Sequence, residues 1–203
     1  TSRHAPAPLT EDKEAALAKA EKEHQAAEAA VARAEAFALE FAERASRAAL
    51  EGRVEEARQD FAKATDGTAN LDVLSLAFQF YERTGDLATA EELLERWLAI
   101  SGPDAQSANT AAALGNLGLI YMTRGDLDRA EEMHQKALAI EEKFGRQVGM
   151  ASDYGNLGLI YQMRGDLDRA EEMHQKALAL EEKLGREEGM ASEYGNLGLI
   201  YRK

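Results

Sequence analysis

Histidines and paired glutamates are the residues of this chain whose types and spacing are best suited to chemistry. Two of the four histidines, His134 and His174, stand in nearly identical stretches of sequence. Such a pair could bind a metal ion or relay a proton. We favour a packing role, as an imidazole in the core or at its boundary. Equivalent residues of stacked helical units lie about 10 Å apart, too far to share one ion. We therefore predict no metal site.

Adjacent glutamates could provide a second kind of site, because two carboxylates can bind a cation or divide the roles of acid and base. They belong to segments expected to form outward-facing helices, so we expect solvated carboxylates. The pairs are Glu131-Glu132, Glu141-Glu142 and Glu181-Glu182. The chain has no cysteine, no P-loop, no HExxH motif and no Ser-His-Asp arrangement, and its Gly-Asn-Leu-Gly text lies inside a helical pattern. We predict that it is not an enzyme and uses no cofactor.

Composition limits both the fold and the partners. The 203 residues carry 24 basic and 37 acidic side chains, a net charge of -13, which argues against nucleic acid as a partner. No apolar run approaches the roughly 18 residues of a membrane span, so none is predicted. Alanine and other helix formers abound and prolines number only three, which predicts an all-α protein. Abundant alanine, with more arginine than lysine, suggests a bacterial source.

An internal repeat determines the predicted architecture. Residues 111–150 and 151–190 align without gaps and match at 31 of 40 positions, and 191–203 begins another copy. Gly85 precedes Gly125 by the interval that separates Gly125 from Gly165, so 71–110 is a diverged copy. Residues 38–70 form a shorter, degenerate unit. We predict that 191–203 is the first helix of a truncated unit. Its apolar sequence is typical of an internal repeat, so we expect a longer array.

Each unit encodes two helices. Apolar residues recur every three or four positions in the first helix, as in Leu114, Leu117, Ile120 and Tyr121. Gly125 can then adopt the left-handed conformation that ends a helix, and Asp126 can cap the next one. Small side chains at Gly118 and Ala130 allow the two helices to cross closely, and Gly145 can cap the second helix.

This pattern resembles the tetratricopeptide repeat (TPR) family. The matching positions are Leu117, Gly118, Tyr121, Ala130 and Ala137, repeated at Leu157, Gly158, Tyr161, Ala170 and Ala177. Glu142 and Glu182 stand where the usual, shorter unit has proline, and the longer unit is similar to those of kinesin light chains and the LGN family. The resemblance implies a TPR-type α-solenoid, a right-handed superhelix of helical hairpins. Phe78 and Trp97 fill the small positions of 71–110, so its packing must differ.

The N-terminal region has a different character. Residues 1–10, with two prolines, are predicted to be a flexible leader, and 11–51 a long alanine-rich helix that precedes the solenoid. An apolar seam with alternating spacings of three and four runs through Leu17, Ala20, His24, Ala27, Val31, Ala34, Ala38, Phe41, Ala45 and Ala48. Such a seam is typical of coiled coils. We expect the helix to fold back on its own repeats rather than form a free dimer, with 38–51 also serving the degenerate unit.

The remaining candidate site is a surface. In TPR arrays the first helix of each unit lines the concave groove, and in relatives of the resembling type asparagines there hold the backbone of an extended peptide. An amide both donates and accepts, so it matches a peptide unit; the alternative is an amide that caps or bridges neighbouring helices. Arg124, Arg164 and Arg202 could meet a few carboxylates of a ligand. The predicted peptide-binding residues are Asn116, Leu119, Met122, Thr123, Asn156, Leu159, Gln162, Met163, Asn196 and Leu199.

The sequence therefore favours a protein-interaction scaffold that binds an extended peptide or a partner helix in the concave groove. Two alternatives stay open. One is a self-assembling module that forms homo-oligomers by end-to-end stacking or helix exchange. The other is the regulatory repeat region of a larger multidomain protein.

Overall fold

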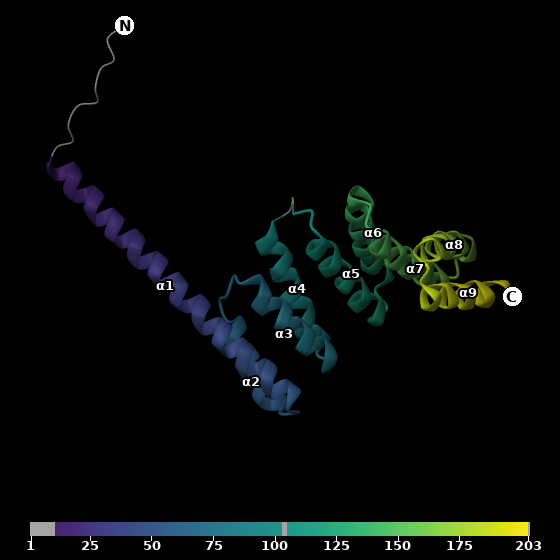
Figure 1. Cartoon of the computed structure of the whole chain (residues 1–203), viewed down its shortest axis with the longest axis horizontal. Coiled ribbons are helices and arrows are strands. Elements are labelled where there is room, and N and C mark those ends of the chain that lie inside the picture. The colour runs from purple at the N-terminus through teal and green to yellow at the C-terminus, as the bar shows by residue number, and fades with distance from the viewer. Residues whose placement is uncertain (1–10, 103–104, 203) are drawn as a thin grey trace, which may run out of the picture. The chain divides into compact units, whose positions relative to one another are not determined.

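Every regular element in the described residues is an α-helix (Figure 1). A computed structural model describes residues 11–102 and 105–202; the leader predicted for 1–10 lies outside them. The all-α prediction is confirmed. The helices are α1 (Glu11–Leu50), α2 (Val54–Thr65), α3 (Leu71–Arg83), α4 (Leu87–Ser101), α5 (Ala108–Thr123), α6 (Leu127–Phe144), α7 (Gln147–Arg164), α8 (Leu167–Leu184) and α9 (Glu187–Tyr201). None of these is both long and apolar enough to cross a membrane.

The chain forms two compact units, Thr1–Ala77 and Phe78–Lys203, whose boundary falls within α3. In the first unit, the C-terminal part of α1 packs against α2. The contact is made of small residues on α1, since Ala38, Ala42, Ala45 and Ala48 are all buried. On α2 the buried Phe61 provides the bulk that these alanines accommodate.

Within the described residues of the first unit, the N-terminal part of α1 is not covered by another helix. All side chains of residues 13–37 are exposed, including the two largest members of the seam in this stretch, Leu17 and Val31. The physical reason is reach, because the short helix α2 covers only the last few turns of the much longer α1.

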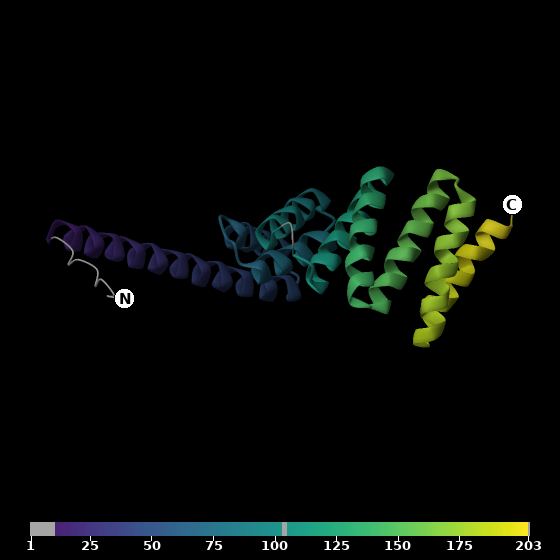
Figure 2. The same cartoon turned by 90° about the horizontal axis from the view of Figure 1, so that it is seen from above.

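The second unit is a stack of helical hairpins (Figure 2). From α4 to α9, each helix contacts the next one along the chain. In addition α5 contacts α7, and α7 contacts α9, whereas α6 and α8 make no such contact in the part of the chain that is described. Helices that lie closer together are on the inner side of a curved stack, so α5, α7 and α9 form the inner, concave layer and α6 and α8 the outer layer.

The predicted turn chemistry is confirmed. Gly125 and Gly165 have φ angles of 78° and 79°, in the left-handed region that only glycine adopts easily. The aspartate after each glycine, Asp126 or Asp166, caps the following helix by accepting a hydrogen bond from a backbone N–H of its first turn. These turns fix where each outer helix begins, and so align the repeated positions of successive inner helices.

The core of the second unit matches the predicted periodicity. Leu117, Ile120 and Tyr121 are buried on α5, and Ala130 and Ala137 are buried on α6. In the diverged repeat the bulky Phe78 and Trp97 are buried as well. Positions that hold small side chains in one repeat therefore hold large side chains in another, while the arrangement of the helices is the same.

Candidate binding groove

Three asparagines occupy the same repeat position on successive inner helices. Asn116 lies on α5, Asn156 on α7 and Asn196 on α9, and each is half-buried. None of their side-chain amides makes a hydrogen bond within residues 11–102 and 105–202, so none caps or bridges a helix there. An amide that is half-buried but unpaired retains its capacity to donate and accept toward an incoming group.

Leucines flank the asparagine ladder one turn further along each inner helix. Leu119 is 37% exposed and Leu199 is 53% exposed, while Leu159 is half-buried. Exposed leucines in register on a concave face offer apolar area that is removed from water only when a ligand covers it.

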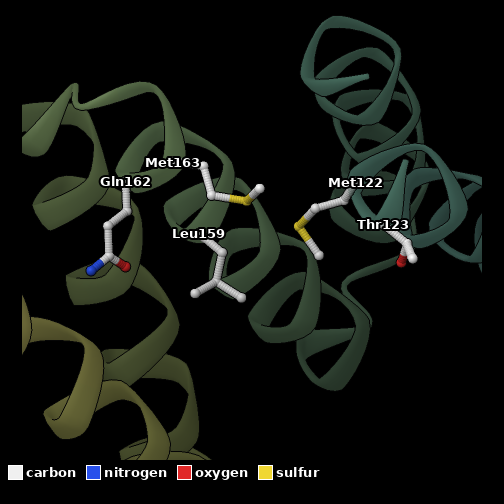
Figure 3. Close-up of a pocket in the computed structure, with 5 residues that line it drawn as sticks. All are labelled: Met122, Thr123, Leu159, Gln162 and Met163. Atoms are coloured by element: carbon white, nitrogen blue, oxygen red, sulfur yellow. The ribbon is translucent and has the colours of Figure 1, made fainter. Parts of the chain in front are cut away.

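Five of the predicted site residues line one shallow pocket of about 300 Å³ (Figure 3). Met122 of α5 and Met163 and Leu159 of α7 direct their side chains toward the same space, with Thr123 and Gln162 at its edges. Methionine side chains adapt to the shape of an apolar group, and no charged residue lines the pocket.

A second cavity, of about 230 Å³, lies beside the asparagines. Asn116, Leu119 and Asn156 line it, as predicted for the groove. Its other lining residues include three that sequence reasoning did not assign to a site, namely His134, Glu141 and Asp153. The groove therefore has a polar, ionisable floor at this point.

The two repeated histidines are core residues, as predicted, but each also bridges two repeats. His134 and His174 are wholly buried, and the Nδ1 atom of His134 lies 3.0 Å from Asp153 Oδ1. The Nδ1 atom of His174 lies 2.6 Å from Glu193 Oε2. Each bond joins an outer helix to the next inner helix. No group of three potential metal ligands comes together among the described residues.

Burial raises the pKa of the Asp153 carboxyl above its usual range, and the hydrogen bond from His134 opposes that rise. The ring of His134 also explains Gly118: a Cβ atom there would lie 2.5 Å from His134 Nε2. The predicted close crossing of the two helices is therefore correct, with the imidazole as the group that needs the space.

The expectation that the paired glutamates are solvated is wrong for one glutamate in each of two pairs. Glu141 and Glu181 are buried, whereas Glu142, Glu182 and Glu132 are exposed as predicted. Glu141 accepts a hydrogen bond from Arg146 at 2.6 Å, and a Cβ on Gly149 would overlap its carboxyl group. Burial is possible because Gly149, at the start of the next helix, leaves room for the carboxylate.

Further carboxylates of the outer helices bind the inner helix of the next repeat. Glu131 accepts a hydrogen bond from the Tyr161 hydroxyl at 2.5 Å and pairs with Arg164. Burial raises the pKa of Tyr121, an equivalent tyrosine, to about 12, and the adjacent Glu91 adds to that rise. Arg124 and Arg164, which we expected to be available to ligand carboxylates, are engaged within the chain.

A signal for the histidine bridges was present in the sequence. Asp153 and Glu193 follow the two repeated histidines at the same interval, and they are the same chemical type at the same repeat position. A comparison of repeats at positions that differ conservatively, rather than only at identical ones, would have found them.

Comparisons with known proteins agree with the fold of stacked helical hairpins. Two tetratricopeptide repeat models match the chain, over residues 68–143 and 151–187. Among solved structures, BtubC (BKLC) from P. vanneervenii is similar with a TM-score of 0.69 and 26% identity, covering 90% of this chain and 78% of that one. MamA follows with a TM-score of 0.64 and 22% identity over 82% and 81%.

A putative kinesin light chain from Podosopora anserina with nearly identical TPR-like repeats is also similar, with a TM-score of 0.65 and 22% identity over 80% of this chain and 84% of that one. At 22% identity the likeness to the latter two structures shows the fold alone. No curated protein matches the chain.

Proposed function

The chain belongs to the tetratricopeptide repeat family, a family of protein-interaction scaffolds that is generally non-catalytic, and from this premise we propose that its concave face binds an extended, largely uncharged peptide segment of a partner protein. The segment lies along α5, α7 and α9. Its backbone is held by the asparagine ladder, and its side chains cover the exposed leucines.

One observation carries this proposal: Asn116, Asn156 and Asn196 are half-buried, in register, and without hydrogen-bond partners among the described residues. Water hydrates these partly exposed amides in the free chain, and a ligand group that pairs with them takes the place of that water. A peptide backbone has a donor and an acceptor at every residue other than proline, so one extended strand can satisfy successive amides.

The methionine-lined pocket supports the same mode of binding. It lies on the inner helices beside Leu159, and its apolar lining fits an aliphatic or methionine side chain of the peptide. The absence of any arginine or lysine from its lining favours a neutral residue at this point of the peptide.

The test begins with peptides selected on the whole chain from a displayed random library. Their affinity is then measured by calorimetry for the unaltered chain and for the double variant Asn116→Ala/Asn156→Ala. Loss of two hydrogen bonds worth about 1 kcal/mol each predicts roughly 30-fold weaker binding, with an unchanged melting temperature.

A matched control removes two amides from the outer layer instead. Gln135→Ala/Gln175→Ala alters exposed positions of α6 and α8, and binding should stay within about twofold of the unaltered chain. Equal losses of affinity in both double variants would contradict the role of the ladder in binding. A melting temperature that falls by several degrees in the asparagine variant would show that the ladder is structural.

Self-association is a second candidate function, favoured by the surface of α9. Tyr194, Leu199 and Tyr201 are between 53% and 62% exposed, while Leu197 and Ile200 are already buried within the chain. An end-to-end contact through these side chains should be weak. Sedimentation velocity over a hundredfold range of concentration should then show a rising mass that Leu199→Ser/Tyr201→Ser abolishes; a constant monomer mass contradicts this candidate.

A further inference from the structure

The cavity beside Gly115 differs from the methionine-lined pocket of the groove, because it has buried carboxylates in its lining. Asp153 is 6% exposed and Glu141 is 7% exposed. Glu141 is engaged by Arg146, whereas Asp153 uses only its Oδ1 atom, toward His134, within the described residues. No lysine or arginine lines the cavity. It is therefore an acidic recess, in contrast to the uncharged methionine-lined pocket.

The next repeat contains the same residues with one informative change. Each residue that lines the cavity has an equivalent one repeat later, and the two sets differ only where Ala112 becomes Ser152 and where Asp153 becomes Glu193. Both acids bind the Nδ1 atom of the preceding histidine. The repeats thus provide a natural comparison of a short and a long acid in one environment.

The length of the acid determines how much space remains beside the inner glycine. A Cβ built on Gly115 would lie 3.9 Å from Asp153 Oδ1, an ordinary contact distance. A Cβ built on Gly155 would lie only 2.9 Å from Glu193 Oε1. The additional methylene of Glu193 places its Oε1 atom, rather than the Oε2 atom that pairs with His174, against Gly155 of α7. It occupies there the volume that is equivalent to the open space beside Gly115.

The open recess suits one particular shape of ligand. Ala111, Ala112 and Leu119 give it apolar walls, and the carboxylate of Asp153 lies in its lining. His134, wholly buried with an unpaired Nε2, also lines it. With a water-sized group occupying about 30 Å³, 230 Å³ has room for a short alkyl chain that ends in a hydrogen-bond donor.

We propose that this recess binds a primary alkylammonium group, supplied in the cell by one lysine side chain of the peptide in the groove. The methylenes pack against the alanines and Leu119, and the ammonium group donates to Asp153. The lysine rests on the proposed peptide-binding function, whereas the alkylammonium site can be tested without any peptide. The opposite charge of the ligand also agrees with the net charge of -13 on the chain.

The experiment titrates the whole chain with n-butylammonium chloride and follows amide chemical shifts by nuclear magnetic resonance. n-Butanol, a neutral molecule of the same length, is the control, and sodium chloride holds the ionic strength constant. We expect saturable shifts at Gly115, Ser152 and Asn156 with n-butylammonium, at millimolar concentrations given the few atoms involved. n-Butanol should bind at least about fivefold more weakly.

Two reciprocal variants make the test specific. Asp153→Glu keeps the charge and can keep the histidine bond, but fills the recess as Glu193 does, so the n-butylammonium shifts at Gly115 should disappear. Glu193→Asp opens the equivalent recess, so new shifts should appear at Gly155. Melting curves of both variants should coincide with that of the unaltered chain to within a few degrees, which shows that they are folded.

The proposal is overturned if n-butylammonium gives no saturable shifts near Gly115, or if Asp153→Glu retains them in full. It is also overturned if n-butanol binds equally well, because the carboxylate then contributes nothing. Failure of this site is distinguishable from failure of the groove: peptides that bind in an asparagine-dependent manner to a chain without the ammonium site would leave the proposed function standing.

Discussion

The boundaries between successive repeats differ in the type of side chain buried at one pair of equivalent positions, which is apolar at one boundary and ionisable at the others. Leu94 on α4 and Ala113 on α5 are both buried, and they occupy the repeat positions that hold His134 and Asp153 at the next boundary and His174 and Glu193 at the one after that. At each boundary the two facing positions are therefore of the same kind: both are apolar at the first boundary, and both are ionisable at the next two. The helical layout is maintained in each case.

The difference shows that the two members of each pair depend on each other. A buried ionisable pair is weak evidence for stability, since well-packed apolar residues often replace it without loss. Removal of one member alone leaves a buried polar group without a partner, which is costly. A third position, on the inner helix of each repeat, varies together with this pair. Gly118 and Gly158 leave room for an imidazole, whereas the diverged repeat, which has no imidazole there, has the bulky Phe78 at the corresponding position.

The largest effect is expected when one bridge loses its acid. Asp153→Ala leaves His134 Nδ1 buried without a partner, and should lower the free energy of unfolding by about 3 kcal/mol. The double variant His134→Leu/Asp153→Ala copies the apolar pair of the earlier boundary and should recover all but about 1 kcal/mol of that loss. Urea unfolding of both variants measures this, and a double variant as unstable as the single one would contradict mutual dependence.

A smaller loss is expected when the space for the imidazole is removed. Gly118→Ala places a methyl group 2.5 Å from His134 Nε2 and should cost about 2 kcal/mol through displacement of the ring. Gly198 is the matched control, because it has the same repeat position on α9 and a Cβ there meets no atom within 4 Å. Gly198→Ala should leave stability unchanged or raise it by about 0.5 kcal/mol; equal losses at both sites would refute the role of the ring.

The tyrosine–glutamate contacts should make the chain less stable in alkali. Burial, followed by the neighbouring Glu91 and Glu142, raises the pKa of Tyr121 and Tyr154 to about 12. In the unfolded chain tyrosine ionises near pH 10, so between about pH 10 and pH 12 the unfolded state loses protons that the folded state retains. The free energy of unfolding then falls as the pH rises, by about 1 kcal/mol per tyrosine after allowance for solvent.

Unfolding curves at about pH 9 and pH 11, with tyrosinate absorbance as an independent reading, measure this loss. Tyr121→Phe cannot ionise and should reduce the difference between the two curves. A pH dependence that is the same in the variant would show that this hydroxyl does not titrate with folding.

The smallest effect is expected at the exposed counterpart of the buried pairs. Lys136 lies 2.6 Å from Glu132, but both side chains are more than half exposed. Solvent screens such a pair, so Lys136→Ala should change the free energy of unfolding by no more than about 0.5 kcal/mol. A change as large as that of Asp153→Ala would mean that burial is not what distinguishes the bridges.

The turns and the core of the repeats were predictable because the chemistry that fixes them is local. Gly125 and Asp126 determine the turn by their own conformation and hydrogen bonding, and the spacing of Leu117 and Tyr121 defines a helical face. The bridge from His134 to Asp153 was not predicted, since it depends on how far two repeats approach each other. The burial of Glu141 likewise depends on a glycine in the next helix.

The N-terminal helix was only half predictable for a similar reason. Its helicity follows from its composition, but the seam through Leu17 and Val31 says only that one face is apolar. It does not say what covers that face, and the structure shows these side chains exposed. The groove residues share this limit: their register follows from the repeat, whereas their ligand does not.

The most direct test of the groove is a crystal structure of the chain with a peptide selected from the displayed library. We expect an extended peptide along α5, α7 and α9, with its backbone N–H or C=O groups within about 2.7–3.2 Å of the side-chain amides of Asn116 and Asn156. A peptide on the outer helices α6 and α8, or one in the groove whose backbone leaves both asparagines without a hydrogen bond, would contradict it.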